Sequence, residues 1–198
     1  MVHVDERLER ITIRPGEFYV SAGPALITTL LGSCVSACLY DPVRRIVGMN
    51  HFLLSNKRYA KDMPFTITEA GRYGMNAMEL LINEMMNLGA ERANLRAKAF
   101  GGGSVLQLAE GTGSFFCVGE VNKRFIIEYL KTEGIPLVKA DLGGDRGRVI
   151  HFNSEDYAVY VRKIKNTVYP QLMQREHQFW ETSIERQERS EAEPDIWL

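Results

Sequence analysis

Residues 25–54 read ALITTLLGSCVSACLYDPVRRIVGMNHFLL, and the expected fold is built around this segment. It contains two runs before residue 41 and one after residue 45 that are rich in apolar and β-branched residues, as is typical of buried strands. The polar sequence that begins with Asp41 and Pro42 predicts a turn between the last two runs. We therefore expect an antiparallel hairpin of buried strands here.

The hairpin brings a thiol and an imidazole within reach of each other. Cys34 precedes the turn and His51 follows it at a similar separation, so the two side chains can face each other across paired strands. A thiol is a strong nucleophile only as a thiolate, and a nearby imidazole can take its proton. Gly32 and Ser33 are small enough to let a carbonyl group approach Cys34. The alternative is that Cys34 and His51 are ordinary core residues.

The composition is that of a globular protein of one domain. The chain has 198 residues, 45% hydrophobic and 25% charged, with a net charge of −1 and both signs interspersed. This balance indicates no nucleic-acid surface, and no apolar run is long enough for membrane insertion. Three cysteines without a secretory signal favour the cytoplasm over a disulfide framework. Four scattered histidines and no CxxC pair predict no metal site and no metal cofactor.

Two helices and further strands complete the predicted domain, residues 1–168. The first helix runs from about residue 68 to Gly89 and the second over 119–133, each with apolar residues on one face. On the first helix these are Met78, Leu81, Met85 and Leu88. The remaining strands are expected at 11–21 with a break at Pro15-Gly16, and at 95–100, 136–141, 148–153 and 157–164. Cys38 and Cys117 are interpreted as core residues.

Two glycine-rich segments raise the question of a phosphate site. The sequence AFGGGSV at 99–105 follows a strand, but no Gly-Lys-Ser/Thr follows it, and the chain has no GxGxxG fingerprint. The turn LGGDRGR at 142–148 contains Arg146 and Arg148, which could hold an anion. Tight turns and close backbone packing explain these glycines more simply, so we expect no nucleotide cofactor.

The segment 169–198 is expected to form a charged, helical C-terminal extension. Four residues fall on one narrow stripe at helical spacing: Met173, His177, Trp180 and Ile184. Such a stripe is too small to stabilise a lone helix, so the segment would dock on its own domain, bind in a groove of a partner, or fray.

The hairpin carries a family signature. The stretch TTLLGSCVSACLYDP at 28–42, followed by GMNHFLL at 48–54, resembles that of the CheD family, the chemoreceptor glutamine deamidases of bacterial and archaeal chemotaxis. The likeness continues in order through RYGMNAMELLINEMMNLGA, LRAKAFGGG, GEVN, ADLGGDRGRVIHFN and YVRKI, over residues 11–165. Ser55 stands where many members have proline, and the tail is longer than in compact members.

The resemblance implies a site and a fold. It makes Cys34 the nucleophile, His51 the second active-site residue and Thr28 the third, six positions before the nucleophile. We expect the hydroxyl of Thr28 to orient His51. The family fold is α/β, a mixed-sheet α/β sandwich with two main amphipathic helices, to which this chain adds its C-terminal helical extension.

The resemblance also implies a reaction and partners. Cys34 would attack the side-chain amide of glutamines in methyl-accepting chemotaxis receptors and form a thioester, which water converts to glutamate. Glutamyl methyl esters would be cleaved as well. One alternative is a non-catalytic adaptor that binds a CheC-type phosphatase. A second is a thiol redox protein using Cys34 and Cys38, but four residues along a strand span roughly 13 Å, beyond the ~7 Å that a disulfide allows.

Overall fold

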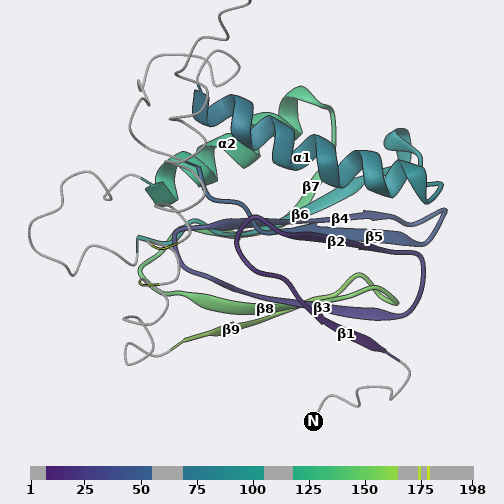
Figure 1. The fold of residues 1–198 in the computed structure, drawn as a ribbon, viewed down its shortest axis with the longest axis horizontal. Helices are drawn as coiled ribbons and strands as arrows, with labels where there is room; N and C mark the ends of the chain where they lie inside the picture. The colour runs from purple at the N-terminus through teal and green to yellow at the C-terminus, as the bar shows by residue number, and fades with distance from the viewer. Residues whose placement is uncertain (1–7, 55–68, 105–117, 165–173, 175–177, 179–198) are drawn as a thin grey trace, which may run out of the picture.

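The structure is a computed structural model that describes residues 8–54, 69–104 and 118–164, together with Gln174 and Gln178. These residues form three layers: two helices, a five-stranded sheet and a four-stranded sheet (Figure 1). Both helices cover the same face of the five-stranded sheet, and the four-stranded sheet packs on its other face. The mixed-sheet α/β sandwich with two main helices is thereby confirmed.

The two sheets draw their strands from both halves of the chain. The four-stranded sheet has the order β1 (Glu9–Thr12), β3 (Ala25–Leu31), β8 (Arg148–Asn153), β9 (Val159–Lys163). The five-stranded sheet has the order β2 (Phe18–Ser21), β5 (Ile46–Asn50), β4 (Val35–Asp41), β6 (Arg96–Gly101), β7 (Leu137–Leu142). The β1–β3 and β6–β7 pairs are parallel and the others antiparallel, so both sheets are mixed.

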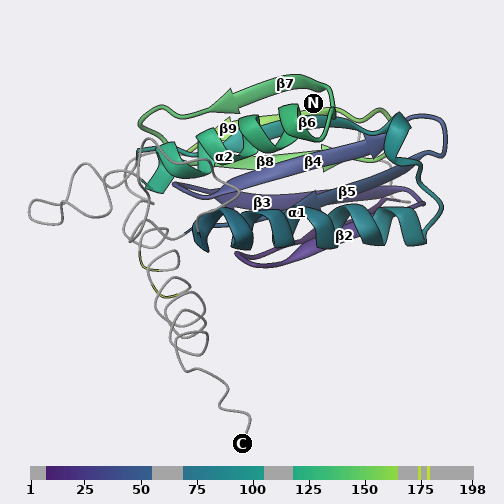
Figure 2. The same ribbon diagram turned by 90° about the horizontal axis from the view of Figure 1, so that it is seen from above.

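The helices are α1 (Glu69–Asn87) and α2 (Val118–Thr132), with the short 3-10 helix η2 (Arg92–Asn94) between α1 and β6. Figure 2 shows α1 over β2 and β5, and α2 over the half of the sheet that contains β6 and β7. No helix among the described residues is both long and apolar enough to cross a bilayer.

The layer order explains the pattern of the hairpin. Every residue of β4 and β5 is buried, because this sheet has helices on one face and a second sheet on the other. Strand β3 instead alternates between buried and half-buried residues, because only one face of its sheet is covered. Two cores result, one between the helices and the five-stranded sheet and one between the sheets.

Most predicted elements lie within two residues of the observed ones. The helix predicted from residue 68 ends at Asn87, and its buried residues include Met78, Leu81 and Met85. Leu88 was wrongly placed on this face, because it follows the last helical residue and is 46% exposed. The hairpin strand predicted to reach Leu54 ends at Asn50, although a Val35–Phe52 bridge extends the pairing.

The predicted break at Pro15-Gly16 separates strands of different sheets. Strand β1 before the break pairs with β3, whereas β2 after it pairs with β5. This crossing brings the carbonyl of Ile13 between the sheets, where it contacts the candidate site. Cys117 and the stripe Met173, His177, Trp180 and Ile184 lie outside the described residues. Gln174 and Gln178, within the predicted extension, are helical and exposed.

Candidate active site

Cys34 lies in the turn that connects β3 to β4, directly before the first residue of β4. Its carbonyl oxygen accepts a hydrogen bond from the backbone N–H of Gly102 at 2.7 Å, and the carbonyl of Gly32 accepts one from Gly103 at 2.8 Å. Gly101 has φ 112°, and a Cβ there would collide with the carbonyl oxygen of Cys34. The glycine cluster therefore supports the turn that carries Cys34, as tight backbone packing predicted.

The strand register places Cys34 and His51 on one face of the five-stranded sheet. Cys38 pairs with Met49 and Val35 with Phe52, so the same register sets Cys34 opposite Leu53 and next to His51 on the diagonal. Directly opposed residues share a face, and residues two apart on a strand share it too. Both side chains therefore point between the two sheets, on one face of the hairpin, as its spacing allowed.

The imidazole of His51 is held by the opposite sheet. Its Nδ1 lies 2.7 Å from the hydroxyl oxygen of Thr29 on β3. That hydroxyl donates its hydrogen to the carbonyl of Ile13 at 2.8 Å, so it can only accept from Nδ1. Nδ1 of His51 must then carry the proton, and Nε2 carries a lone pair. The arrangement selects the tautomer in which Nε2 can act as a base.

His51 is neutral in this environment. The side chain is 2% exposed, and burial lowers the pKa of His51 from its ordinary 6.5 to about 3. Within the described part of the chain, Nε2 of His51 makes no hydrogen bond. Catalytic hydrogen bonds are often unformed before substrate binds. The geometry is therefore that of a neutral base beside a thiol, and not of a preformed thiolate–imidazolium pair.

The predicted contact between Thr28 and His51 is wrong. Thr28 points to the opposite face of β3, where its hydroxyl lies 2.9 Å from Nδ1 of His151. The reason is the alternation of side chains along a strand, which turns neighbouring threonines to opposite faces. Thr29, which the sequence analysis missed, makes the contact expected of Thr28.

Cys38 shares a face with Cys34 but has the features of a core residue. It is fully buried, and burial raises the pKa of its thiol to about 12, so it carries no useful thiolate near neutral pH. The structure forms no disulfide between Cys34 and Cys38. A redox role for this pair therefore has no structural support.

Arg148, which the sequence offered as an anion-binding residue, makes its hydrogen bonds within the protein. The guanidinium of Arg148 is 1% exposed and donates to the carboxylate of Asp141 at 2.8 Å. It also donates to the backbone carbonyls of Asp141, Gly143 and Arg146. The anion-binding alternative for Arg148 is therefore wrong, because this side chain closes the 142–148 turn. The described residues contain no group of three or more His, Cys, Asp or Glu placed to hold a metal ion.

Tyr73 of α1 lies near both candidate residues. Burial raises the pKa of Tyr73, and the charge that Cys34 would carry as a thiolate raises it further, so the phenol is close to Cys34. A pocket of about 90 Å³ is lined by Tyr73, Phe18, Asn50 and His51, among others. Asn50 hydrogen-bonds to α1, so the pocket lies beside this helix.

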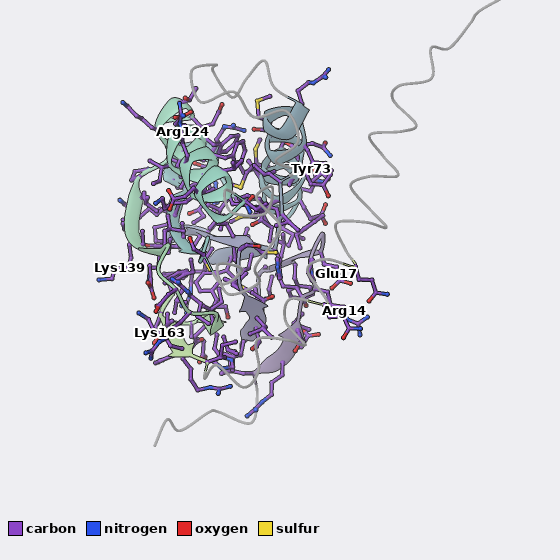
Figure 3. The ribbon with its side chains drawn as sticks, turned by 90° about the vertical axis from the view of Figure 1, so that its left-hand side faces the viewer. Arg14, Glu17, Tyr73, Arg124, Lys139 and Lys163 are labelled. Atoms are coloured by element: carbon purple, nitrogen blue, oxygen red, sulfur yellow. The ribbon has the colours of Figure 1, made fainter. Side chains whose placement is uncertain are left out.

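A larger pocket, of about 430 Å³, contains neither candidate residue. It lies between edge strands β7 and β9, and its lining includes Lys98, Lys139 and Lys163. Figure 3 shows Lys139 and Lys163 on one flank of the molecule and Tyr73 on the other. Lysines on edge strands commonly prevent pairing with other chains, which accounts for Lys139 on β7 and Lys163 on β9. Lys98 on β6 donates to the carbonyl of Tyr157.

Fold and site together define a class: an α/β sandwich whose inter-sheet face carries a cysteine and a neutral histidine oriented by a threonine. The chain belongs to the CheD family, since the family model described as CheD chemotactic sensory transduction matches residues 54–163. A relative from Geobacter sulfurreducens, named probable chemoreceptor glutamine deamidase CheD 1, is 53% identical over 95% of this chain and 94% of its own. The Shewanella oneidensis protein named probable chemoreceptor glutamine deamidase CheD 2 is 48% identical over 76% and 74%.

Among solved structures, the YfiH protein of Bacillus licheniformis matches with a TM-score of 0.37 and 16% identity, over 63% of this chain and 49% of its own. That likeness is too small to bear on fold or function.

The buried neutral His51 predicts a stability that falls in acid. Between pH 6.5 and about 3 the unfolded chain binds a proton at this residue and the folded chain does not. The free energy of unfolding should therefore decrease as the pH falls through this window, by up to about 1.4 kcal/mol per pH unit. Urea unfolding at a series of pH values measures this slope.

The control is His51→Asn, whose amide N–H can occupy the place of Nδ1–H without titrating. This variant should show a shallower slope than the wild type, while His151→Asn should change the slope less, since His151 is only partly buried. Equal slopes for the wild type and His51→Asn would contradict a neutral, buried His51.

Proposed function

We propose that the chain is a chemoreceptor glutamine deamidase in which Cys34 is the nucleophile, His51 the general base and Thr29 the residue that orients His51. The observation that carries the proposal is the relay from Nδ1 of His51 through the hydroxyl of Thr29 to the carbonyl of Ile13. It leaves the lone pair of Nε2 on the face shared with Cys34. Membership of a family whose members are named glutamine deamidases supplies the substrate.

Attack on the amide begins with a proton transfer. Nε2 of His51 takes the proton of the Cys34 thiol, and the sulfur forms a bond to the side-chain carbonyl carbon of glutamine. The low resting pKa of His51 makes the imidazolium unfavourable on its own. The negative charge that forms next to it raises that pKa, so proton transfer and attack proceed together.

Collapse of the tetrahedral adduct releases ammonia and leaves a thioester. The imidazolium of His51 returns its proton to the departing nitrogen as the carbon–nitrogen bond breaks. Neutral His51 then takes a proton from water, and the hydroxide attacks the thioester carbonyl. The carbon–sulfur bond breaks, the sulfur of Cys34 regains its proton, and the product is glutamate. A glutamyl methyl ester would follow the same steps with methanol as the leaving group.

The substrate and partners follow from this assignment. The substrate is the part of a methyl-accepting chemoreceptor that lies in the cytoplasm, where we also place the enzyme. A CheC-type phosphatase stays a predicted partner. The non-catalytic adaptor is not favoured, because an adaptor would have no need of the tautomer that Thr29 imposes on His51.

Replacing Cys34 with Ala should abolish deamidation and leave the protein folded, because the change removes the nucleophile and only one buried atom. The measurement is mass spectrometry of receptor cytoplasmic fragments after incubation with the enzyme, in which each converted glutamine gains about one dalton as an amide becomes an acid. Cys38→Ala is the matched control and should keep its turnover at some cost in stability.

Deamidation by a folded Cys34→Ala protein at the wild-type rate would remove Cys34 from the nucleophile role. Absence of any mass gain with the wild-type enzyme would instead remove the deamidase assignment.

Two adjacent threonines allow a sharp test of the relay. Thr29→Val keeps the shape of the side chain but removes the hydroxyl that fixes the His51 tautomer, so kcat should fall by about 10- to 100-fold. Thr28→Val removes a hydroxyl that contacts His151 on the outer face, and its kcat should stay near that of the wild type. Steady-state kinetics on a glutamine-containing receptor fragment compares them. A larger loss with Thr28→Val would show that the residue implied by the family resemblance acts in catalysis after all.

A further inference from the structure

One buried amide connects the segments that carry Cys34 and His51. Asn122 on α2 is 0% exposed, and its Nδ2 donates to the carbonyl of Ser33 at 2.9 Å. Its Oδ1 accepts from the backbone N–H of Leu54 at 2.8 Å. Ser33 directly precedes Cys34, and Leu54 follows His51 by three residues. The amide oxygen and the amide nitrogen of Asn122 are thus each bound to one of the two segments that flank the hairpin strands.

The position of these two hydrogen bonds in the β4–β5 register is informative. Val35 and Phe52 exchange both backbone hydrogen bonds, at 3.0 and 2.9 Å. In an antiparallel ladder such pairs recur every second residue, so the next pair in this register would be Ser33 with Leu54. In that pair the Leu54 N–H would donate to the Ser33 carbonyl. Instead, the Leu54 N–H donates to Oδ1 of Asn122, and Nδ2 of Asn122 donates to the Ser33 carbonyl.

We propose that Asn122 is a positioning residue that replaces the Ser33–Leu54 rung of the ladder and holds the strands apart there. Cys34 lies between this opened rung and the last closed one, Val35–Phe52. The width of one amide group therefore sets the separation of the Cys34 turn from the segment that follows His51. This role rests on the proposed function, because it places the nucleophile relative to its base.

The hydrogen bonds on both sides of the Cys34 turn make its position depend on its distance from Leu54. The carbonyls of Gly32 and Cys34 are bound by Gly103 and Gly102 on one side, and the carbonyl of Ser33 is bound by Asn122 on the other. Gly119 of α2 packs on the backbone of the same glycines, so the helix that presents Asn122 is fixed against the turn. Without the amide, Leu54 N–H and Ser33 carbonyl can pair directly, which satisfies both groups and draws the turn toward Leu54.

Asn122→Ala tests the role in the full-length protein with two readouts. A displacement of about 1 Å in an active site can lower turnover by about 10²-fold, so kcat on the receptor fragment should fall by that order with little change in KM. The rate of Cys34 alkylation by iodoacetamide, followed by peptide mass mapping, should change by about tenfold or more for the same reason. Asn122→Asp keeps the shape but cannot donate to Ser33 when ionised, and it should shift both readouts in the same direction.

Ser154→Ala is the matched control. The Ser154 hydroxyl accepts from Ala25 N–H at 2.7 Å and donates to the Gly23 carbonyl at 3.0 Å, so it too is a buried side chain that both donates to and accepts from backbone groups, at the start of β3. Its loss should lower stability without changing kcat or Cys34 alkylation.

The outcomes separate this role from the function on which it rests. A wild-type protein that deamidates no receptor fragment refutes the proposed function, and the alkylation rates then still decide the role of Asn122. If either Asn122 variant folds with wild-type kcat and wild-type Cys34 alkylation, the positioning role is overturned. Changes in Asn122→Ala that Ser154→Ala reproduces would reduce Asn122 to a stabilising core residue.

Discussion

The hydrogen bond between Nδ1 of His51 and the hydroxyl of Thr29 is the contact on which the rest of the proposed active site depends. It joins the five-stranded sheet to the four-stranded sheet at a fully buried point. Because Thr29 already donates to Ile13, the contact fixes the His51 tautomer as well as its orientation. In the proposed mechanism, a stabilising contact between the sheets and a catalytic constraint are thus the same interaction. The proposed function needs the sandwich to be closed, since neither sheet alone holds the imidazole.

The strand pairing near this contact also positions the candidate residues. The β4–β5 ladder places Cys34 and His51 on one face, and the ladder opens where Asn122 replaces a rung. The glycines at 101–103 then let a second segment approach the Cys34 turn without side chains. The glycines thus allow close packing of backbone next to the Cys34 turn, whereas Asn122 contacts the same turn through its side-chain amide.

Much of the fold could be predicted from the sequence, because its strands are short apolar runs with clear turns and its helices have strong periodicity. The hairpin and the shared face of Cys34 and His51 followed from spacing around the turn. The spacing did not show whether Thr28 or Thr29 contacts His51. Strand β3 has apolar residues on both faces, so its alternation cannot show which threonine points inward until the sheets are placed.

The sequence also contains a signal for Asn122. It falls at helical spacing among Val121, Phe125, Ile126 and Tyr129, and a polar residue within an apolar stripe indicates a buried hydrogen-bonding role. Its two partners, however, come from segments 68 and 89 residues away in the chain. Only the three-dimensional arrangement reveals that they are the two ends of a missing rung.

The protonation state of His51 can be measured directly in the folded protein. Nitrogen-15 NMR of protein labelled in its histidines, with His51 assigned through the His51→Asn variant, reports each ring nitrogen separately. We expect a proton on Nδ1 and none on Nε2 at every pH from 8 down to 5, since burial holds the pKa of His51 at about 3. An imidazole that carries its proton on Nε2, or that becomes doubly protonated near its ordinary pKa of 6.5, would rule out the tautomer that Thr29 imposes.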